Sequence, residues 1–245
     1  MRPVLFRWRD RVIWSYPAML YVGLVAGVVA GNLAAHAFGI DPFRVYIATL
    51  VLLIPALAGA RLQWVLTHWD FYRRNLHRIW NRGEGGGAMY GGLPLAVLCS
   101  VPLLKALGLG LGAFWDVAVF TILVGMIFTR VGCLLNGCCA GRPSENWLSA
   151  YLPNRRGIWQ KRVPTQVLEA FWAGILLLLA VQVRQLVPFR GALFLLVVAS
   201  YAGGRFLLEY AREQEPGSSR FTWDHGISLI TLLSSVTVLL IIWRG

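Results

Sequence analysis

Three polar residues recur at helical spacing inside an otherwise apolar stretch near the end of the chain. Tyr201, Arg205 and Glu209 stand four residues apart, so on a helix they form one stripe on one face. Such groups are costly inside apolar spans and usually face a bundle interior or a cavity. Two interpretations remain open: an Arg–Glu pair that neutralises itself, or a site for a polar ligand.

A second arginine lies deep in an apolar stretch and is followed by small residues. The segment from Arg130 contains Asn136, Gly137 and Gly141. A guanidinium can bind a phosphate through two parallel hydrogen bonds, and glycine lets the backbone turn and approach a ligand closely. We therefore expect these four residues to bind substrate. The alternative for Arg130 is a side chain that extends to the surface and caps a helix.

Three of the four cysteines fall in this same segment. Cys133, Cys138 and Cys139 could bind a soft metal, but no fourth ligand stands at a recognisable spacing. A reactive thiol is a second interpretation, because nearby arginines lower a thiol pKa, and apolar filler at a helix end is a third. We expect no metal and no cofactor, and we include Cys133 and Cys138 among the substrate-binding residues.

Other polar residues stand where apolar stretches begin or end. Tyr16 enters the first stretch, Arg61 ends the second and Gln166 opens the fifth. A glycine-rich segment, 80–92, contains Tyr90 and enters the third stretch. We expect Tyr16, Arg61 and Gln166 to contribute to substrate binding.

The overall composition indicates which elements position these residues. Of the 245 residues, 57% are hydrophobic and 14% are charged, and the mean hydropathy is +0.60. A soluble domain carries about 25% charged residues, so much of this surface must face lipid. The net charge of +12 indicates an anionic membrane surface or an anionic substrate. We expect no nucleic-acid partner, because no soluble basic module is visible.

Seven apolar stretches are long enough to cross a bilayer, which takes about 20 residues. We therefore expect an all-α, polytopic integral membrane protein with about seven transmembrane helices and a single domain over 1–245. The first stretch exceeds the apolar core of a secretory signal, which favours a first transmembrane helix. Two connections, at about 61–90 and 138–163, are long enough to carry function. The stretches run approximately over 13–38, 43–66, 88–111, 114–137, 164–187, 190–211 and 222–243.

The distribution of basic residues bears on sidedness. With seven spans, the N-terminal tail shares one side with the connections after spans two, four and six, and that side holds 18 of the 23 Lys and Arg residues. The positive-inside rule would place this side in the cytoplasm. The rule misleads if many of these arginines bind substrate instead.

Taken in order, these motifs resemble the prolipoprotein diacylglyceryl transferases of bacterial inner membranes. The signature of that family is similar to the segment Arg130-x-Gly-x-x-x-Asn136-Gly137 with Gly141 following. The resemblance extends over nearly the whole chain. The other matching positions are Tyr16, Gly59-Ala-Arg61, the segment 80–92, Asp116, Pro164-x-Gln166-x-x-Glu169 and the stripe Tyr201, Arg205 and Glu209.

The resemblance implies a reaction. A diacylglyceryl group passes from phosphatidylglycerol to the thiol of the lipobox cysteine in a prolipoprotein signal peptide, and glycerol-1-phosphate leaves. Arg130 and Arg205 would stabilise the charge on the leaving phosphate. Glu209 or Tyr90 would accept the thiol proton, although Glu209 alternatively only holds Arg205 in place, and Tyr201 and Arg205 would be catalytic residues with them. Family topology implies a site at the outer face and an N-terminus outside, against the positive-inside count.

The chain also departs from the family pattern. Tyr90 stands where many members have a histidine, Cys133 replaces an asparagine, Cys138 replaces a glutamate, and Val163 replaces a histidine. These departures leave open a paralogous phospholipid-using transferase with a different acceptor. A non-enzymatic anion or lipid transporter is a third alternative, although transporters commonly show internal repeats and none is evident here.

Overall fold

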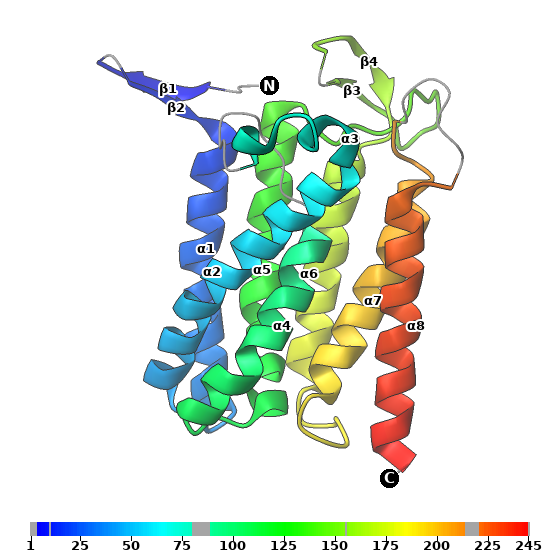
Figure 1. The fold of residues 1–245 in the computed structure, drawn as a ribbon. Coiled ribbons are helices and arrows are strands. Elements are labelled where there is room, and N and C mark those ends of the chain that lie inside the picture. Colours follow the sequence, from blue (N-terminus) through cyan, green and yellow to red (C-terminus); the bar gives the residue numbers. More distant parts are fainter. Residues whose placement is uncertain (1–3, 10, 80–88, 155, 214–220, 245) are drawn as a thin grey trace.

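The computed structural model describes residues 4–9, 11–79, 89–154, 156–213 and 221–244. Over these residues the chain forms a bundle of long helices that run along a common direction (Figure 1). The long helices are α1 (Ser15–Ala37), α2 (Pro42–Thr67), α4 (Met89–Ala106), α5 (Leu111–Asn136), α6 (Thr165–Val183), α7 (Ala192–Glu209) and α8 (Trp223–Arg244).

The expected membrane spans are confirmed. Six of these helices are long and apolar enough to cross a membrane, and α4 contributes a shorter apolar helix, Gly91–Ala106. At a rise of 1.5 Å per residue, the 18 residues of α4 extend about 27 Å, close to the thickness of a hydrocarbon core. Large apolar side chains such as Leu33, Ile54, Leu178 and Ile230 are at least 66% exposed, as expected for a surface that contacts lipid. The protein is a multi-pass, all-α membrane protein.

Two expected boundaries differ from the structure. Helix α2 continues to Thr67, so Arg61 lies within the helix and does not begin the connection that was expected at 61. Helix α4 ends at Ala106, five residues before the expected end of its span. The backbone turns there through Gly108, whose φ of +66° suits glycine.

Small residues allow α1 to pack closely on α5. Gly23, Gly27 and Gly31 recur every four residues and are buried. A Cβ at Gly23 would overlap the Cβ of Phe128, and one at Gly27 or Gly31 would overlap Thr121. Membrane helices associate through van der Waals packing, so such small-residue faces let backbones approach. This contact fixes the position of α5, which carries Arg130.

Asp116, a match to the family pattern in α5, caps the start of α7. Its carboxylate accepts hydrogen bonds from the backbone N–H groups of Gly191 at 2.6 Å and Phe194 at 2.9 Å. The first N–H groups of a helix have no partner within the helix, so a buried carboxylate stabilises that end. Asp116 is 2% exposed and therefore acts as a structural anchor between α5 and α7.

Two small hairpins, which the sequence did not indicate, lie at one end of the bundle. Strands β1 (Val4–Trp8) and β2 (Arg11–Trp14) pair antiparallel, as do β3 (Ala150–Pro153) and β4 (Trp159–Arg162). The short helix α3 (Trp69–Tyr72) and the 3-10 turn η1 (Leu76–Arg78) lie at this same end (Figure 1). The C-terminus of α8 lies at the opposite end.

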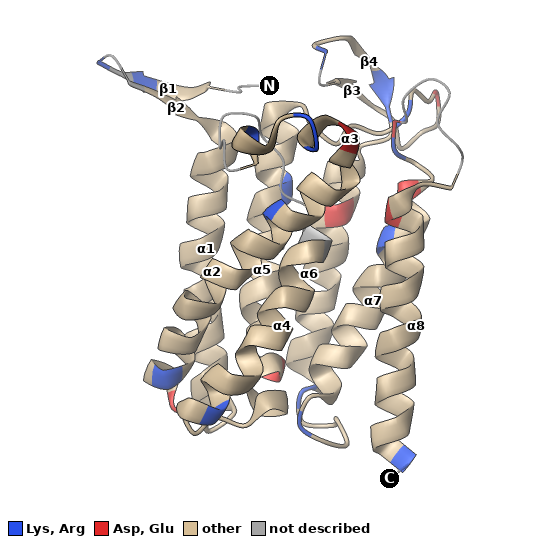
Figure 2. Ribbon diagram, viewed as in Figure 1, with Lys and Arg blue, Asp and Glu red and all other residues tan. Residues whose placement is uncertain are grey.

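Charged residues concentrate toward the end of the bundle that carries the hairpins. Figure 2 shows basic and acidic positions of α5, α6 and α7 near this end, within helices that are otherwise largely uncharged. Charges inside a membrane bundle are costly unless paired, so this cluster is the first candidate for function.

Candidate active site

The stripe predicted on α7 is buried. Tyr201, Arg205 and Glu209 are each at most 8% exposed. Nη1 of Arg205 lies 2.8 Å from Oε2 of Glu209, one helical turn along. The self-neutralising pair considered above is therefore present, but it is one part of a larger network.

Glu169 of α6 joins α5 to α7. Its Oε2 lies 2.5 Å from Nη2 of Arg130, and its Oε1 lies 3.3 Å from Nη1 of Arg205. The side chains of Glu169 and Arg130 are only 2% and 12% exposed. Because removing one partner leaves a buried charge without compensation, the three helices hold these groups together as a unit.

Two further charged residues extend the network toward the end of the bundle. Arg212 lies three residues beyond α7, with Nη1 3.2 Å from Oε2 of Glu209. Asp224, in the first turn of α8, has Oδ2 3.5 Å from Nη2 of Arg205 and 3.7 Å from Nη1 of Arg212. Burial by itself would lower the pKa of Arg212, but the Cys139 thiol and the Glu209 carboxylate beside it raise that pKa.

The buried part of this network has a positive surplus. Its three arginines and two glutamates give a net charge of +1, and Asp224, with a side chain 40% exposed, stands at the solvent boundary. A phosphodiester carries one negative charge. The network, with one unpaired positive charge, therefore suits a phosphodiester ligand. The attraction between the two is strengthened because the network is poorly hydrated. Its five members are Glu169, Arg205 and Glu209, which are buried, and Arg130 and Arg212, whose side chains are 12% and 15% exposed.

Two donors of the network are free for a ligand. Nε of Arg130 and the hydroxyl of Tyr201 are buried and have no hydrogen-bond partner among the described residues. Tyr201 lies beside Arg130 and Arg205, whose charges act on it. Most buried polar atoms in folded proteins are paired, so unpaired donors next to surplus positive charge indicate a binding site for an oxyanion.

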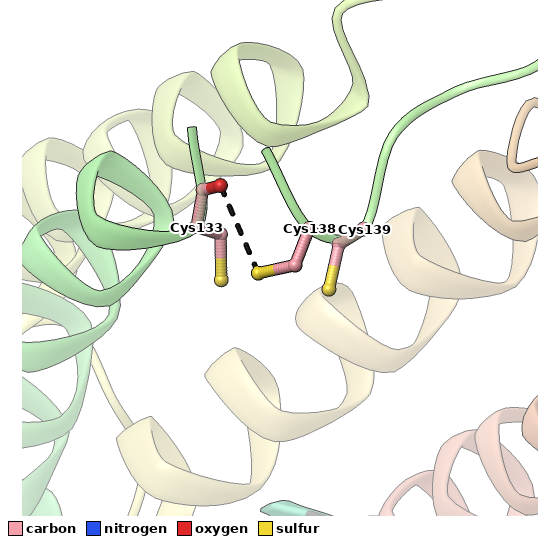
Figure 3. A group of neighbouring side chains, drawn as sticks. All are labelled: Cys133, Cys138 and Cys139. Atoms are coloured by element: carbon pink, nitrogen blue, oxygen red, sulfur yellow. Dashed lines mark hydrogen bonds between the residues drawn. The ribbon is translucent and has the colours of Figure 1, made fainter. Parts of the chain in front are cut away.

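The cysteine segment follows directly on α5 and lies beside the network. In Figure 3 the sulfur of Cys138 lies between those of Cys133 and Cys139, and the three sulfur atoms all lie within 4.8 Å of one another. The thiol of Cys138 donates to the carbonyl of Cys133 at 3.7 Å. Hydrogen bonds from Cys133 and Cys138 lower the pKa of the Cys139 thiol, and the charges of Arg212 and Arg130 lower it further. The three thiols therefore form one cluster at the end of α5.

Helix α6 holds this segment through two buried side chains. Oγ1 of Thr165 donates to the carbonyl of Cys139, and Nε2 of Gln166 donates to the carbonyl of Cys138, both at 2.8 Å. The predicted residue Gln166 is thus brought to the site, where it orients the loop. Gly141 packs so closely that a Cβ would overlap the carbonyl of Val163.

Comparison with known proteins shows the family of the chain. The family model described as prolipoprotein diacylglyceryl transferase matches residues 3–243. The chain belongs to this family. A phosphatidylglycerol–prolipoprotein diacylglyceryl transferase of Bacillus cereus (strain ATCC 14579) is 30% identical over 212 residues, which cover 82% of this chain and 77% of that protein. One of Clostridium botulinum (strain 657) is 27% identical over 220 residues, with 86% and 87% covered.

Other predicted residues of this family member take different positions around the network. Tyr16 of α1 packs against Gly132, one residue before Cys133, and lies near Arg130 and the three thiols. Asn136 ends α5 and is exposed, and Gly137 turns the chain with a φ of +71°. These residues surround the cysteine segment, as their order in the sequence suggested.

Arg61 contacts the segment that follows α2. Nε of Arg61 donates to the carbonyl of Ile79 at 2.8 Å, and Nη2 donates to the hydroxyl of Tyr72 at 3.3 Å. These bonds tie α2 to the segment that follows it. Tyr90 belongs to the first turn of α4, but its side chain, like residues 80–88 of the predicted glycine-rich segment, lies outside the described residues.

Sequence reasoning left three members of the network out of the expected site. Glu169 was noted as part of a motif, and Arg212 and Asp224 were not singled out. Glu169 follows Gln166 by three residues on a helix, which places the two on neighbouring positions of one face. This spacing was the available signal for Glu169. Asp224 carried no comparable signal, because its partners lie on another helix.

Proposed function

We propose that this chain transfers the diacylglyceryl group of phosphatidylglycerol to the thiol of a lipobox cysteine in a prolipoprotein signal peptide. Two independent observations support this proposal. The relatives matched over most of the chain carry this activity in their names. The buried network, with a net charge of +1 and two unpaired donors, offers a binding site for one phosphodiester.

The chemistry assigns distinct roles to the arginines. The thiolate sulfur forms a bond to the glycerol carbon that carries the phosphate, and the bond between that carbon and the phosphate oxygen breaks. Glycerol-1-phosphate leaves with the electron pair. Arg130 and Arg205 flank Glu169 and stabilise the charge that develops on the leaving oxygen.

The thiol proton requires an acceptor, and two candidates stand in this proposal. Glu209 accepts from both Arg205 and Arg212, so it either takes the proton or holds these two guanidiniums in place. Tyr90 is the other candidate. Comparing Glu209→Gln with Tyr90→Phe separates them: loss of the chemical step with lipid binding intact identifies the acceptor.

The remaining predicted residues bind or enclose the substrate. We assign the cysteine segment to the wall beside the lipid phosphate and place the whole site within the single domain 1–245, with functional connections that follow α2 and α5. The residues of this wall are Tyr16, Cys133, Asn136, Gly137, Cys138, Gly141 and Gln166, with Arg61 in the neighbouring connection.

In this proposal the hairpin end of the bundle faces the outer side of a bacterial cytoplasmic membrane. A signal peptide is presented at that side, so a site there meets both substrates. The excess of arginines at this end then serves ligand binding, since Arg130, Arg205 and Arg212 all belong to the network. The positive-inside count therefore does not determine the orientation.

Reconstitution tests the proposal. The purified chain is placed in phosphatidylglycerol vesicles with a lipobox peptide, and mass spectrometry follows the mass of a diacylglyceryl group on the cysteine. We expect modification by the wild-type chain and a loss of at least about 100-fold for Arg130→Ala or Arg205→Ala, the scale for removing one transition-state donor. Arg44→Ala is a matched control, because Arg44 pairs with Asp41 at the opposite end and is half exposed.

The outcomes separate the alternatives. An unmodified peptide with rapid breakdown of phosphatidylglycerol would assign a different acceptor and overturn the proposal in its present form. Anion or lipid flux without lipid breakdown would assign a transporter. Equal activity of Arg205→Ala and Arg44→Ala would remove the network from the mechanism.

A further inference from the structure

The three clustered thiols make and break no bond in the proposed reaction, in which Cys133 and Cys138 only line the wall beside the lipid phosphate. Cys133 ends a buried turn of α5, and Cys138 and Cys139 lie in the loop that follows. Their sulfur atoms lie within 4.8 Å of one another, and no histidine or carboxylate joins them among the described residues. Cys99, the fourth cysteine, is on α4 and is not part of this group.

The spacing of the sulfurs suits one ion. With metal–sulfur bonds of about 2.3 Å, three thiolates around a trigonal ion lie roughly 4 Å apart. The sulfurs of this cluster therefore need to move by less than one ångström to bind a central ion, since the three side chains already lie side by side (Figure 3).

The loop is held in this shape before any ion binds. Gly137 and Cys139 both have left-handed backbone conformations, with φ of +71° and +59°. This conformation is uncommon for a cysteine. Thr165 and Gln166 fix the carbonyls of Cys139 and Cys138 from α6. A preorganised donor set loses less entropy on binding.

From these contacts we propose that Cys133, Cys138 and Cys139 bind one soft, monovalent metal ion, Cu(I). Thiolates select soft ions, and structural zinc sites almost always require four ligands, whereas three sulfurs satisfy Cu(I). Binding releases three protons as the thiols become ligands, and no oxidant or reductant is consumed. The resulting group has two negative charges next to Arg130 and Arg212, so the metal ion and the lipid phosphate compete for these two arginines.

Titration of the full-length protein tests the site directly. The purified chain, reduced and kept without oxygen in detergent, is titrated with Cu(I) against a chromogenic Cu(I) chelator. We expect one Cu(I) per chain, with X-ray absorption showing three sulfur neighbours at about 2.3 Å, as for zinc thiolates. Two or four sulfur neighbours, or tighter binding of Zn(II) than of Cu(I), would overturn the assignment.

Serine variants identify the ligands. Mutating a residue that only supports a metal ligand already lowers the affinity for the metal about 10- to 100-fold. We therefore expect Cys133→Ser, Cys138→Ser and Cys139→Ser, which each remove a ligand, to weaken Cu(I) binding by at least about 100-fold. Cys99→Ser is the matched control and should bind as the wild type does. Unchanged affinity in any of the first three variants would exclude the three-thiol site.

A second measurement needs no variant and therefore does not depend on whether a variant folds. A thiol-alkylating reagent is applied to the wild-type chain with and without Cu(I), and mass spectrometry counts the label at each cysteine. Cu(I) should protect Cys138 and Cys139, which are partly exposed, and leave labelling of Cys99 unchanged. Equal protection of all cysteines, or of none, would contradict the proposal.

Discussion

Arg130 of α5 and Glu169 of α6 form the closest ion pair of the buried network, with Nη2 2.5 Å from Oε2. The same carboxylate contacts Arg205 of α7 through its other oxygen. Two guanidiniums in a poorly hydrated place repel each other, and Glu169 is the charge that holds them on either side of it. The three helices therefore depend on one carboxylate for the geometry of the site.

Replacing Glu169 with glutamine should destabilise the protein as well as inactivate it. The change keeps the shape but leaves Arg130 and Arg205 without their shared counterion, which costs about 3–5 kcal/mol for a buried pair. Unfolding of the two proteins in detergent, by heat or by denaturant, measures the loss of stability. Glu145→Gln is the control, since the Glu145 side chain is 90% exposed and pairs only loosely with Lys161 at 3.8 Å. Equal stability of the two variants would show that the network does not hold the helices.

Asp224 should compete with the lipid phosphate. It contacts both Arg205 and Arg212 at the solvent boundary, so it holds the guanidiniums that an incoming anion needs. Asp224→Asn should lower the KM for phosphatidylglycerol by about 2- to 5-fold, the effect of losing an exposed ion pair, with kcat little changed. Asp41→Asn, at the opposite end, is the control. A KM that rises in Asp224→Asn would make this carboxylate a ligand of the substrate rather than a competitor.

Much of the helical architecture could be predicted because hydropathy is a local property. The expected spans coincide with the helices to within a few residues at most ends, and the four-residue spacing of Tyr201, Arg205 and Glu209 correctly placed them on one buried face. Local spacing determines which face a residue occupies. It also located the segment from Arg130 to Gly141 at the end of α5.

The partners within the site could not be predicted in this way. Glu169 meets Arg205 across 36 residues of chain, and Asp224 meets it from a third helix. Such pairs depend on how the helices pack, which no periodicity encodes. The hairpins were missed for a related reason, because strands of four or five residues at the end of a bundle carry too short a pattern.

Two adjacent glycines on α7 provide a test of how α6 and α7 pack. A Cβ at Gly204 would overlap the indole nitrogen of Trp172, whereas a Cβ at Gly203 meets nothing within 4 Å. Gly204→Ala should push α7 away from α6 and separate Arg205 from Glu169, costing about 1–3 kcal/mol and most of the activity. Gly203→Ala should be neutral or slightly stabilising, because alanine favours a helix. Similar behaviour of the two variants would contradict this packing.

Asp116 should affect stability without taking part in the chemistry. It caps α7 at the end of the bundle opposite the charged network, through hydrogen bonds to Gly191 and Phe194. Asp116→Asn keeps only one good acceptor, and Asp116→Ala keeps none, so the free energy of unfolding should fall by about 1–3 kcal/mol, more for alanine. Thermal unfolding in detergent shows whether the alanine variant is less stable than the asparagine variant. At temperatures where both variants remain folded, transfer to the lipobox peptide should proceed at nearly the wild-type rate. Loss of activity in a fully folded Asp116→Asn protein would instead place Asp116 in the reaction.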